Sequence, residues 1–297
     1  MSVAILCSDG TGGSIHGQNC AEIVFKVTGV RPTVFYAARD ETFEPIKYLF
    51  PDTIQIPEEF QHNNNFERPG YKERFIGEYG QFDEIYYVVP DLLYQNAHAF
   101  DYKRYNTTPT QIKQYRALTH LYKPEKKVFL GLTTTTNGYH YEHIREFIID
   151  LAQRLPDYEL YFPSIKQWAG VSLDYTEILK DLPSNVTVAE NPSFIDSIKV
   201  LCNCEYGIFT CNGLSHIAFS TGQNRLVFDP QFNRIPFMSR WKETYEELVP
   251  FDTPAKQAAK VVEINLRQPI SCLIDRKFLF NIEDKTDFER KVLLKTI

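Results

Sequence analysis

The chain has 297 residues, of which 43% are hydrophobic and 24% charged, a composition typical of a globular protein and a length that suits two domains. Its formal net charge of −6 gives no general attraction to nucleic acid or to anionic lipid. Six cysteines in a chain of this length do not make a disulfide framework, and no segment approaches the roughly 20 apolar residues that a membrane helix requires.

Strand and helix patterns alternate from the first residues onward. The opening apolar run is short and follows no basic region, so we expect a strand rather than a signal peptide, and a cytoplasmic protein. In the first half of the chain the patterns predict strands at residues 3–8, 32–38, 52–57 and 83–91, and helices at residues 19–29, 43–50, 71–80 and 109–122.

A second alternating series follows a charged linker at residues 123–127. It predicts strands at residues 127–133, 158–164, 185–190, 206–211 and 225–230, and helices at residues 141–156, 174–183, 193–204, 214–222 and 253–266. Strands that alternate with helices indicate parallel sheets covered by helices. We therefore expect an α/β protein with two Rossmann-like domains facing each other across a cleft, and we place the boundary between residues 124 and 125.

Ligands of such sheets bind beyond the carboxyl ends of the strands, so the strand-to-helix turns are the places to look for function. The first turn, CSDGTGGSIHGQN at residues 7–19, contains four glycines that let its backbone approach a ligand. Asp9 and His16 are candidate general bases in this turn, and Gly12 and Gly13 are candidate ligand contacts. The alternative is a flexible turn with a solvated Asp and His.

The second turn, LTTTTNGYHYEH at residues 132–143, places hydroxyl groups before a helix N-terminus. Thr134, Thr135 and Thr136 suit a phosphate, to which the helix dipole also contributes. The alternative is an ordinary helix cap after a strand that ends in threonines. The nearby histidines and glutamate match neither H-E-x-x-H nor H-x-x-E-H, so we expect no metal site there.

The third turn lies in FTCNGLSHIAFSTGQNRLVFDP, residues 209–230. Gly213 permits a turn, Ser215 can cap the helix, and the N–H groups of residues 214–217 together with His216 can bind a diphosphate. The alternative is a capping serine beside a packed histidine. The cysteines at 202, 204 and 211 have no convincing fourth ligand, so we expect them to be reduced, and we expect no zinc.

This third segment resembles the donor domain of GT-B glycosyltransferases, most closely the bacterial heptosyltransferase-like group. That group has a turn of the form [DN]-[ST]-G-x-x-H-[IL]-A, and here the sequence is CNGLSHIA, with Asn212 where Ser or Thr is usual. The GTGG of the first turn is similar to a loop of the N-acetylglucosaminyltransferase that makes peptidoglycan precursor. In that family a His follows GTGG directly, whereas here Ser14 does and His16 comes later.

The resemblance implies an acceptor domain at residues 1–124, a nucleotide-sugar donor domain at residues 125–265, and a segment at residues 266–297 that crosses back to the first domain. It implies inverting transfer of a sugar from a nucleoside-diphosphate donor to an acceptor hydroxyl, without a metal or other cofactor, and Asp9 or His16 as the base. The implied donor-binding residues are Gly12, Gly13, Thr134, Thr135, Thr136, Asn212, Gly213, Leu214, Ser215 and His216.

Two other functions stay open at this point: a non-hydrolysing nucleotide-sugar epimerase, and a non-catalytic protein that binds a nucleotide or sugar. The acceptor is open as well, and can be a glycan, a lipid-linked sugar or a modified DNA base of a phage or virus. Residues 102–116, YKRYNTTPTQIKQYR, interleave basic and aromatic side chains that suit phosphates and an unpaired base. The alternative for this segment is a solvated helix face with packed tyrosines.

Overall fold

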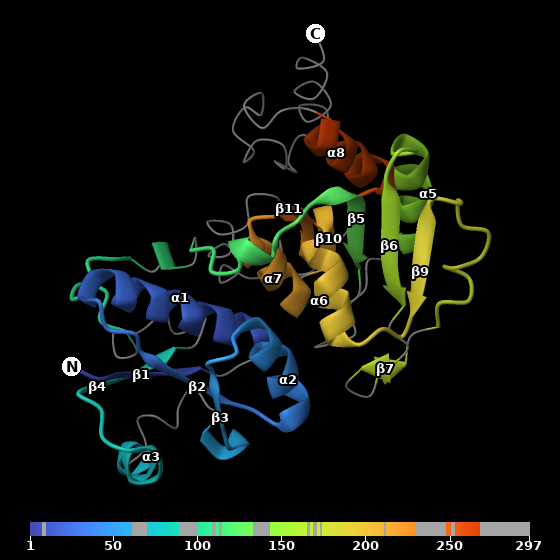
Figure 1. Cartoon of the computed structure of the whole chain (residues 1–297). Helices are drawn as coiled ribbons and strands as arrows, with labels where there is room; N and C mark the ends of the chain where they lie inside the picture. Colours follow the sequence, from blue (N-terminus) through green and yellow to red (C-terminus); the bar gives the residue numbers. More distant parts are fainter. Residues whose placement is uncertain are drawn as a thin grey trace. The chain divides into compact units, whose positions relative to one another are not determined.

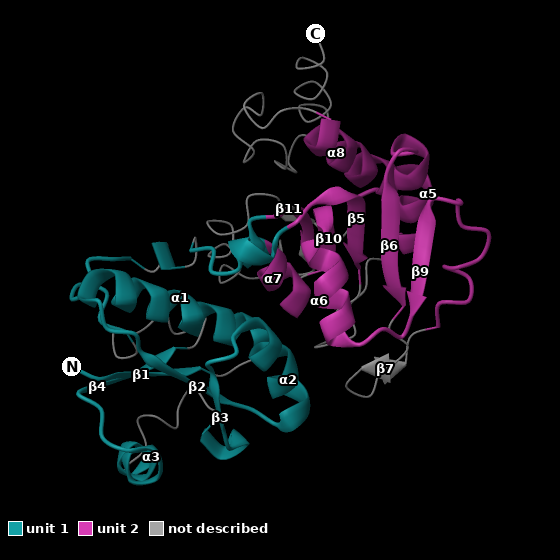
Figure 2. Ribbon diagram, viewed as in Figure 1, with its two compact units in different colours: residues 1–122, 219–222 teal, residues 123–218, 223–297 magenta. Residues whose placement is uncertain are grey.

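The computed structural model describes residues 1–7, 10–60, 70–88, 100–108, 111–112, 115–132, 143–164, 167–168, 171–172, 174–210, 212–229, 248–250 and 253–267. The chain divides into two compact units: residues 1–122 with 219–222, and residues 123–218 with 223–297 (Figure 2). Each unit contains its own parallel sheet (Figure 1).

Unit 1 is built on a four-stranded parallel sheet of order β3-β2-β1-β4. Its strands are β1 (Val3–Cys7), β2 (Thr33–Ala37), β3 (Ile54–Ile56) and β4 (Glu84–Val88). Its helices are α1 (Gly10–Thr28), α2 (Asp40–Leu49) and α3 (Tyr71–Tyr79), with a 3-10 turn at Glu58–Phe60. Both faces of this sheet are covered, which explains why its strands are continuous apolar runs.

Alternation along β1 assigns its side chains to two separate cores. Val3, Ile5 and Cys7 pack with residues of α1 and α2. Ala4 and Leu6 pack on the other face with Phe60 of the 3-10 turn and Phe75 of α3. Because successive side chains of a strand point to opposite faces, a short apolar strand can supply both cores at once.

Unit 2 is built on a six-stranded parallel sheet of order β12-β11-β10-β5-β6-β9. Its strands are β5 (Glu125–Gly131), β6 (Glu159–Ser164), β9 (Val186–Glu190), β10 (Cys204–Thr210), β11 (Asn224–Asp229) and β12 (Leu248–Pro250). Its helices are α5 (Ile144–Arg154), α6 (Phe194–Cys202), α7 (Gly213–Thr221) and α8 (Ala255–Arg267). A separate pair, β7 (Gln167–Trp168) and β8 (Val171–Ser172), is antiparallel.

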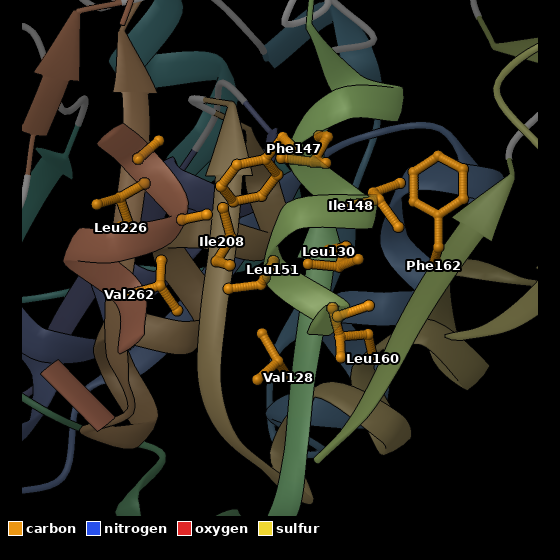
Figure 3. Close-up of a cluster of buried hydrophobic side chains, with 14 of the residues drawn as sticks. Val128, Leu130, Phe147, Ile148, Leu151, Leu160, Phe162, Ile208, Leu226 and Val262 are labelled. Atoms are coloured by element: carbon orange, nitrogen blue, oxygen red, sulfur yellow. The ribbon is translucent and has the colours of Figure 1, made fainter. Parts of the chain in front are cut away.

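The main core of unit 2 lies between its sheet and the helices α5 and α8 (Figure 3). The sheet contributes side chains such as Leu130 and Ile208, α5 contributes Leu151, and α8 contributes Val262. The opposite face of the sheet carries stacked aromatic rings, with the centroids of Phe129 and Phe209 5.9 Å apart. Among the described helices of the chain, none is both long enough and apolar enough to cross a membrane.

Three expected elements differ from the structure. Residues 10–18, expected as a turn, form the first two turns of α1. Residues 174–183, expected as a helix, form turns in which Asp181 has a positive φ of 51° and Tyr175 is buried against Phe162. A left-handed residue interrupts a helix, and packing of the tyrosine ring outweighs the local helical pattern.

The sequence predicts a helix at residues 109–122. Residues 115–122 are described and do not form it: the only helical piece among them is a 3-10 turn at Thr119–Leu121. Here a backbone N–H bonds to another element instead of to its own helix: the N–H of Leu118 donates to the carbonyl of Ser220 at 3.0 Å. A backbone donor that bonds to another element is lost to an α-helix.

Candidate functional site

The strand order of unit 2 marks one position as the natural ligand site. From β5 the chain proceeds outward to β6 and β9, and then returns to the other side of β5 with β10, β11 and β12. This is the doubly wound order 3-2-1-4-5-6, in which ligands bind beyond the carboxyl ends of the strands where the order reverses. Gly131 at the end of β5 and Phe209 near the end of β10 are register partners at this switch point.

The first turn of α7, which follows β10 at this switch point, is held by reciprocal hydrogen bonds. The side-chain Oδ1 of Asn212 accepts from the N–H of Ser215 at 3.1 Å, and the Oγ of Ser215 accepts from the N–H of Asn212 at 3.3 Å. The same hydroxyl donates to the carbonyl of Asn212 at 2.7 Å. Asn212 is therefore the N-cap of α7, and the expectation that Ser215 caps the helix is wrong, because Ser215 occupies the third helical position of a capping box.

This arrangement leaves two backbone donors at the helix start. Within the described residues, the N–H groups of Gly213 and Leu214 have no acceptor, as expected for the first positions of a helix. The Leu214 side chain is buried, Ser215 is buried and His216 is half-buried. Two N–H groups at the positive end of a helix dipole are the kind of group that favours an anion, so the start of α7 is a candidate binding site.

Sequence reasoning missed Gly131 and Phe209 as parts of this site. A Cβ atom at Gly131 would lie 2.7 Å from Cδ1 of Phe209, so ring packing requires glycine at the end of β5. The Gly131 carbonyl accepts from Nδ2 of Asn212 at 3.2 Å. A glycine that ends a buried apolar strand was the available signal, because it indicates close approach by a neighbour.

The segment after β5 carries Thr134, Thr135 and Thr136, which lie outside the described residues, as does Cys211 before the N-cap. The sequence places these threonines just past Leu132, the last described residue after β5. Their predicted contact with a phosphate stays a prediction.

Unit 1 has a switch point of the same kind, between β1 and β4. Asp9 follows β1 there and lies outside the described residues. Helix α1 begins at Gly10, whose φ of 72° is a left-handed value that favours glycine. Gly12 and Gly13 are buried inside the first turn of α1, so the alternative of a flexible turn is wrong for them, and their predicted contact with a ligand stays a prediction.

His16 lies in the second turn of α1 and is only 5% exposed. Three residues later on the same side of the helix, Asn19 donates from Nδ2 to the carbonyl of Ile112 at 2.9 Å. His16 is therefore a packed side chain, and the alternative interpretation of this stretch, with a solvated histidine, is wrong for His16.

The four described cysteines, Cys7, Cys20, Cys202 and Cys204, are free and buried. Burial raises the pKa of the Cys202 thiol to about 11. The expectation of reduced cysteines near the third turn holds for Cys202 and Cys204.

Among the described residues of the basic and aromatic segment 102–116, Tyr105 lies in the core of unit 1, whereas the basic side chains of Lys103, Arg104 and Arg116 are exposed. The Tyr105 ring stacks on Phe100 with centroids 5.1 Å apart and is 1% exposed. Its hydroxyl donates to Glu84 at 2.6 Å, and Arg104 forms an ion pair with the same carboxylate. Burial, followed by the hydrogen bond to Glu84, raises the pKa of Tyr105 to about 12. Tyr105 is thus unable to stack on a nucleic acid base.

No family model matches this sequence, and no curated protein matches it. Among solved structures, the chain is similar to the E. coli heptosyltransferase WaaC with ADP, at 14% identity and a TM-score of 0.58, over 90% of this chain and 98% of that one. It is similar to a glycosyl transferase of family 9 from Veillonella parvula, at 12% identity and a TM-score of 0.52, over 99% of this chain and 97% of that one.

A third similar structure is that of a different kind of enzyme. It is UDP-GlcNAc 2-epimerase from Neisseria meningitidis bound to UDP-GlcNAc, at 10% identity and a TM-score of 0.51, over 100% of this chain and 99% of that one. At such identities the likeness shows the fold alone, which is the GT-B fold of two Rossmann-like units. The predicted fold class and the resemblance to GT-B proteins are confirmed at this level.

Proposed function

We propose that this chain is a glycosyltransferase that moves a sugar from a nucleoside-diphosphate donor to an acceptor hydroxyl. The observation that carries the proposal is the start of α7, where the Asn212 and Ser215 cap leaves the N–H groups of Gly213 and Leu214 at a topological switch point. A diphosphate leaving group is the anion that such a helix start favours.

The proposed donor site acts mainly on the leaving group. As the bond between the anomeric carbon and the diphosphate oxygen breaks, negative charge develops on that oxygen. The N–H groups of Gly213 and Leu214 and the dipole of α7 stabilise this charge, by up to about 2 kcal/mol for the dipole in partly buried geometries. His216 adds a side-chain donor, and Thr134 to Thr136 supply hydroxyls on the β5 side.

The proposed acceptor site belongs to unit 1. The acceptor oxygen attacks the anomeric carbon while the nucleoside diphosphate departs, so one displacement inverts the configuration. Asp9, which follows β1, takes the acceptor proton. His16 is the second candidate for this base, and its burial in α1 argues against it. The step requires no metal, because backbone and side-chain donors carry the leaving-group charge.

An epimerase is the second candidate, and it is favoured by the likeness to the Neisseria structure with UDP-GlcNAc. The third is a protein that binds a nucleotide sugar without turning it over. The acceptor of a transferase is proposed to be a glycan or a lipid-linked sugar. A modified DNA base is less well supported, since the Tyr105 ring is buried in unit 1 and the exposed Arg104 is paired with Glu84.

The first test is a thermal-shift panel of nucleoside diphosphates and their sugars, beginning with ADP and UDP because two similar structures hold ADP and UDP-GlcNAc. A ligand at 100 times its Kd stabilises the folded protein by about 2.7 kcal/mol, so the wild type melts at a higher temperature with its donor. We expect a much smaller shift for His216→Ala. The matched control is His120→Ala, an exposed histidine of unit 1, which keeps the wild-type shift.

The ligand found in this way then separates the candidate functions. The stabilising nucleotide sugar is incubated with the protein and followed by NMR of its phosphorus and anomeric signals. Release of the nucleoside diphosphate supports a transferase, by slow transfer to water, and Asp9→Asn should abolish it while keeping the thermal shift. A new sugar epimer still bound to the diphosphate identifies an epimerase, and an unchanged donor identifies a binding protein. If no nucleoside diphosphate stabilises the wild type, the proposal fails.

A further inference from the structure

We infer that Asn212 is a positioning residue that bridges α7 to the end of β5 and so fixes where the two backbone donors of the proposed diphosphate site lie. The inference rests on the proposed function, and it assigns Asn212 a different task from that of a direct ligand contact. Its side-chain amide has two ends, and each end is bonded to a different element of unit 2.

The contacts of Asn212 form a short chain between the strand β5 and the helix α7. Nδ2 donates to the carbonyl of Gly131 at the end of β5, at 3.2 Å. Oδ1 accepts from the N–H of Ser215 in the first turn of α7, at 3.1 Å. The Gly131 backbone is itself held, because it pairs with β10 and because the Phe209 ring occupies the space where a side chain would be.

An asparagine at the N-cap can bridge the helix to the Gly131 carbonyl of β5, and a serine or threonine cannot. A hydroxyl at an N-cap reaches the N–H groups of the first helical turn, which satisfies the helix but reaches no further. The amide of Asn212 is longer and carries a donor as well as an acceptor. The asparagine at this place, where the resembling group has Ser or Thr, therefore adds a link to β5 that a hydroxyl does not provide.

The consequence concerns the ligand. Gly213 and Leu214 follow Asn212 directly, and the threonines proposed to contact the same diphosphate follow Gly131 in the sequence. The Asn212 bridge thus sets where Gly213 and Leu214, with their N–H groups, lie relative to the end of β5. Misplacement of binding groups by about 1 Å can cost a large part of their effect.

The test compares Asn212→Ala, which loses both links, with Asn212→Ser, which keeps the cap and loses only the link to Gly131. The control is Asn185→Ala. Asn185 also ties backbone carbonyls in unit 2, at Ala152, Leu155 and Tyr158, but it lies at the amino ends of the strands. Calorimetry measures the Kd of ADP and UDP and of the corresponding nucleosides, and hydrogen exchange of residues 212–222 is followed without ligand.

We expect Asn212→Ala to raise the Kd of the nucleoside diphosphate by about tenfold or more, and Asn212→Ser to raise it by a smaller factor. The Kd of the nucleoside should change little in both variants. Exchange of residues 212–222 rises in Asn212→Ala before any ligand is added, since the Ser215 N–H loses its side-chain acceptor and keeps the Asn212 backbone carbonyl. Asn185→Ala lowers the melting temperature and keeps the wild-type Kd. If Asn212→Ser binds ADP or UDP with the wild-type Kd, the inferred role of the bridge to Gly131 is wrong.

Weaker binding with unchanged exchange in the free protein shows a direct ligand contact, and that also overturns the inference. Both outcomes differ from failure of the proposed function, in which neither ADP nor UDP binds the wild type. Should Asn212→Ala fail to fold, the decision falls to Asn212→Ser, whose N-cap hydroxyl keeps the first turn of α7 satisfied.

Discussion

At the scale of single residues, glycines explain the largest difference between expectation and structure. Gly10, Gly12, Gly13 and Gly17 all lie in α1, although glycine is unfavourable in a helix by about 1 kcal/mol relative to alanine. Gly17 has a packing reason: a Cβ atom there would lie 1.8 Å from Sγ of Cys7. Gly17 lets α1 approach β1 closely, a contact between elements that local propensity does not describe.

Gly17→Ala should therefore destabilise the protein by about 1–3 kcal/mol, because the new methyl group overlaps the Cys7 side chain. Gly77 of α3 is the matched control, since a Cβ there meets nothing within 4 Å. Gly77→Ala should stabilise by about 0.5–1 kcal/mol through helix propensity. Chemical denaturation measures both, and the second change of Cys7→Ala should restore much of the loss in Gly17→Ala. Equal effects of the two glycine changes would refute close packing of α1 on β1.

At the scale of elements, periodicity predicted those helices that bury one face against a sheet. α5 has its apolar residues on one side, and Ile144, Phe147, Ile148 and Leu151 all lie in the core of unit 2 (Figure 3). The same method failed at residues 174–183 and 115–122, where one buried ring or one backbone bond to another element fixes the chain. A helical pattern without a sheet face to cover does not determine a helix.

The contrast within α5 is testable with two neighbouring positions. Leu151 is fully buried in the core, whereas Asp150 is half-buried outside it and pairs with Arg154 at 2.6 Å. Leu151→Ala should cost about 2–5 kcal/mol, because it leaves a cavity between α5 and the sheet. Asp150→Ala should cost less than about 1 kcal/mol, and Arg154 keeps Glu263 as a partner. Similar unfolding free energies for the two variants, from urea denaturation, would contradict this placement of α5.

At the scale of the whole molecule, the chain does not leave unit 1 at a single point. Residues 219–222, the end of α7 and the turn after it, group with unit 1, while the start of α7 belongs to unit 2. The contacts are the bond from Leu118 to Ser220 and the Arg116 guanidinium over the Phe219 ring, 5.6 Å from its centroid. Both contacts lie within unit 1, which is why residues 219–222 group with it.

The free energy of unfolding of the whole protein should fall at alkaline pH, because buried tyrosine hydroxyls lose their protons there. Burial and the Glu205 carboxylate raise the pKa of Tyr158 to about 12, and burial raises that of Tyr105 similarly. A pKa raised by folding contributes stability that is complete below the ordinary value of 10 and lost as pH rises through the folded value. The free energy of unfolding should therefore decline between pH 10 and about 12.

The measurement is chemical denaturation at several pH values, with tyrosinate absorbance as a second signal. Tyr158→Phe should reduce the steepness of the decline, because one of the groups that titrate late is gone. Tyr48→Phe, an exposed tyrosine of α2, should leave the steepness unchanged. An unfolding free energy that does not change up to pH 12 would contradict the burial of these hydroxyls.

The sequence by itself determined the α/β class, the two alternating series and the position of the NGLSH turn before a helix, because buried strands and one-sided helices have periods that local sequence displays. It did not determine the start of α1, the cap at Asn212 or the role of Gly131. Those depend on which strands become neighbours: the contact of Gly17 with Cys7 and the bond from Asn212 to Gly131 join residues that only the folded sheet brings together. Tertiary structure decided them because the energy of such a contact exceeds the local preferences that oppose it.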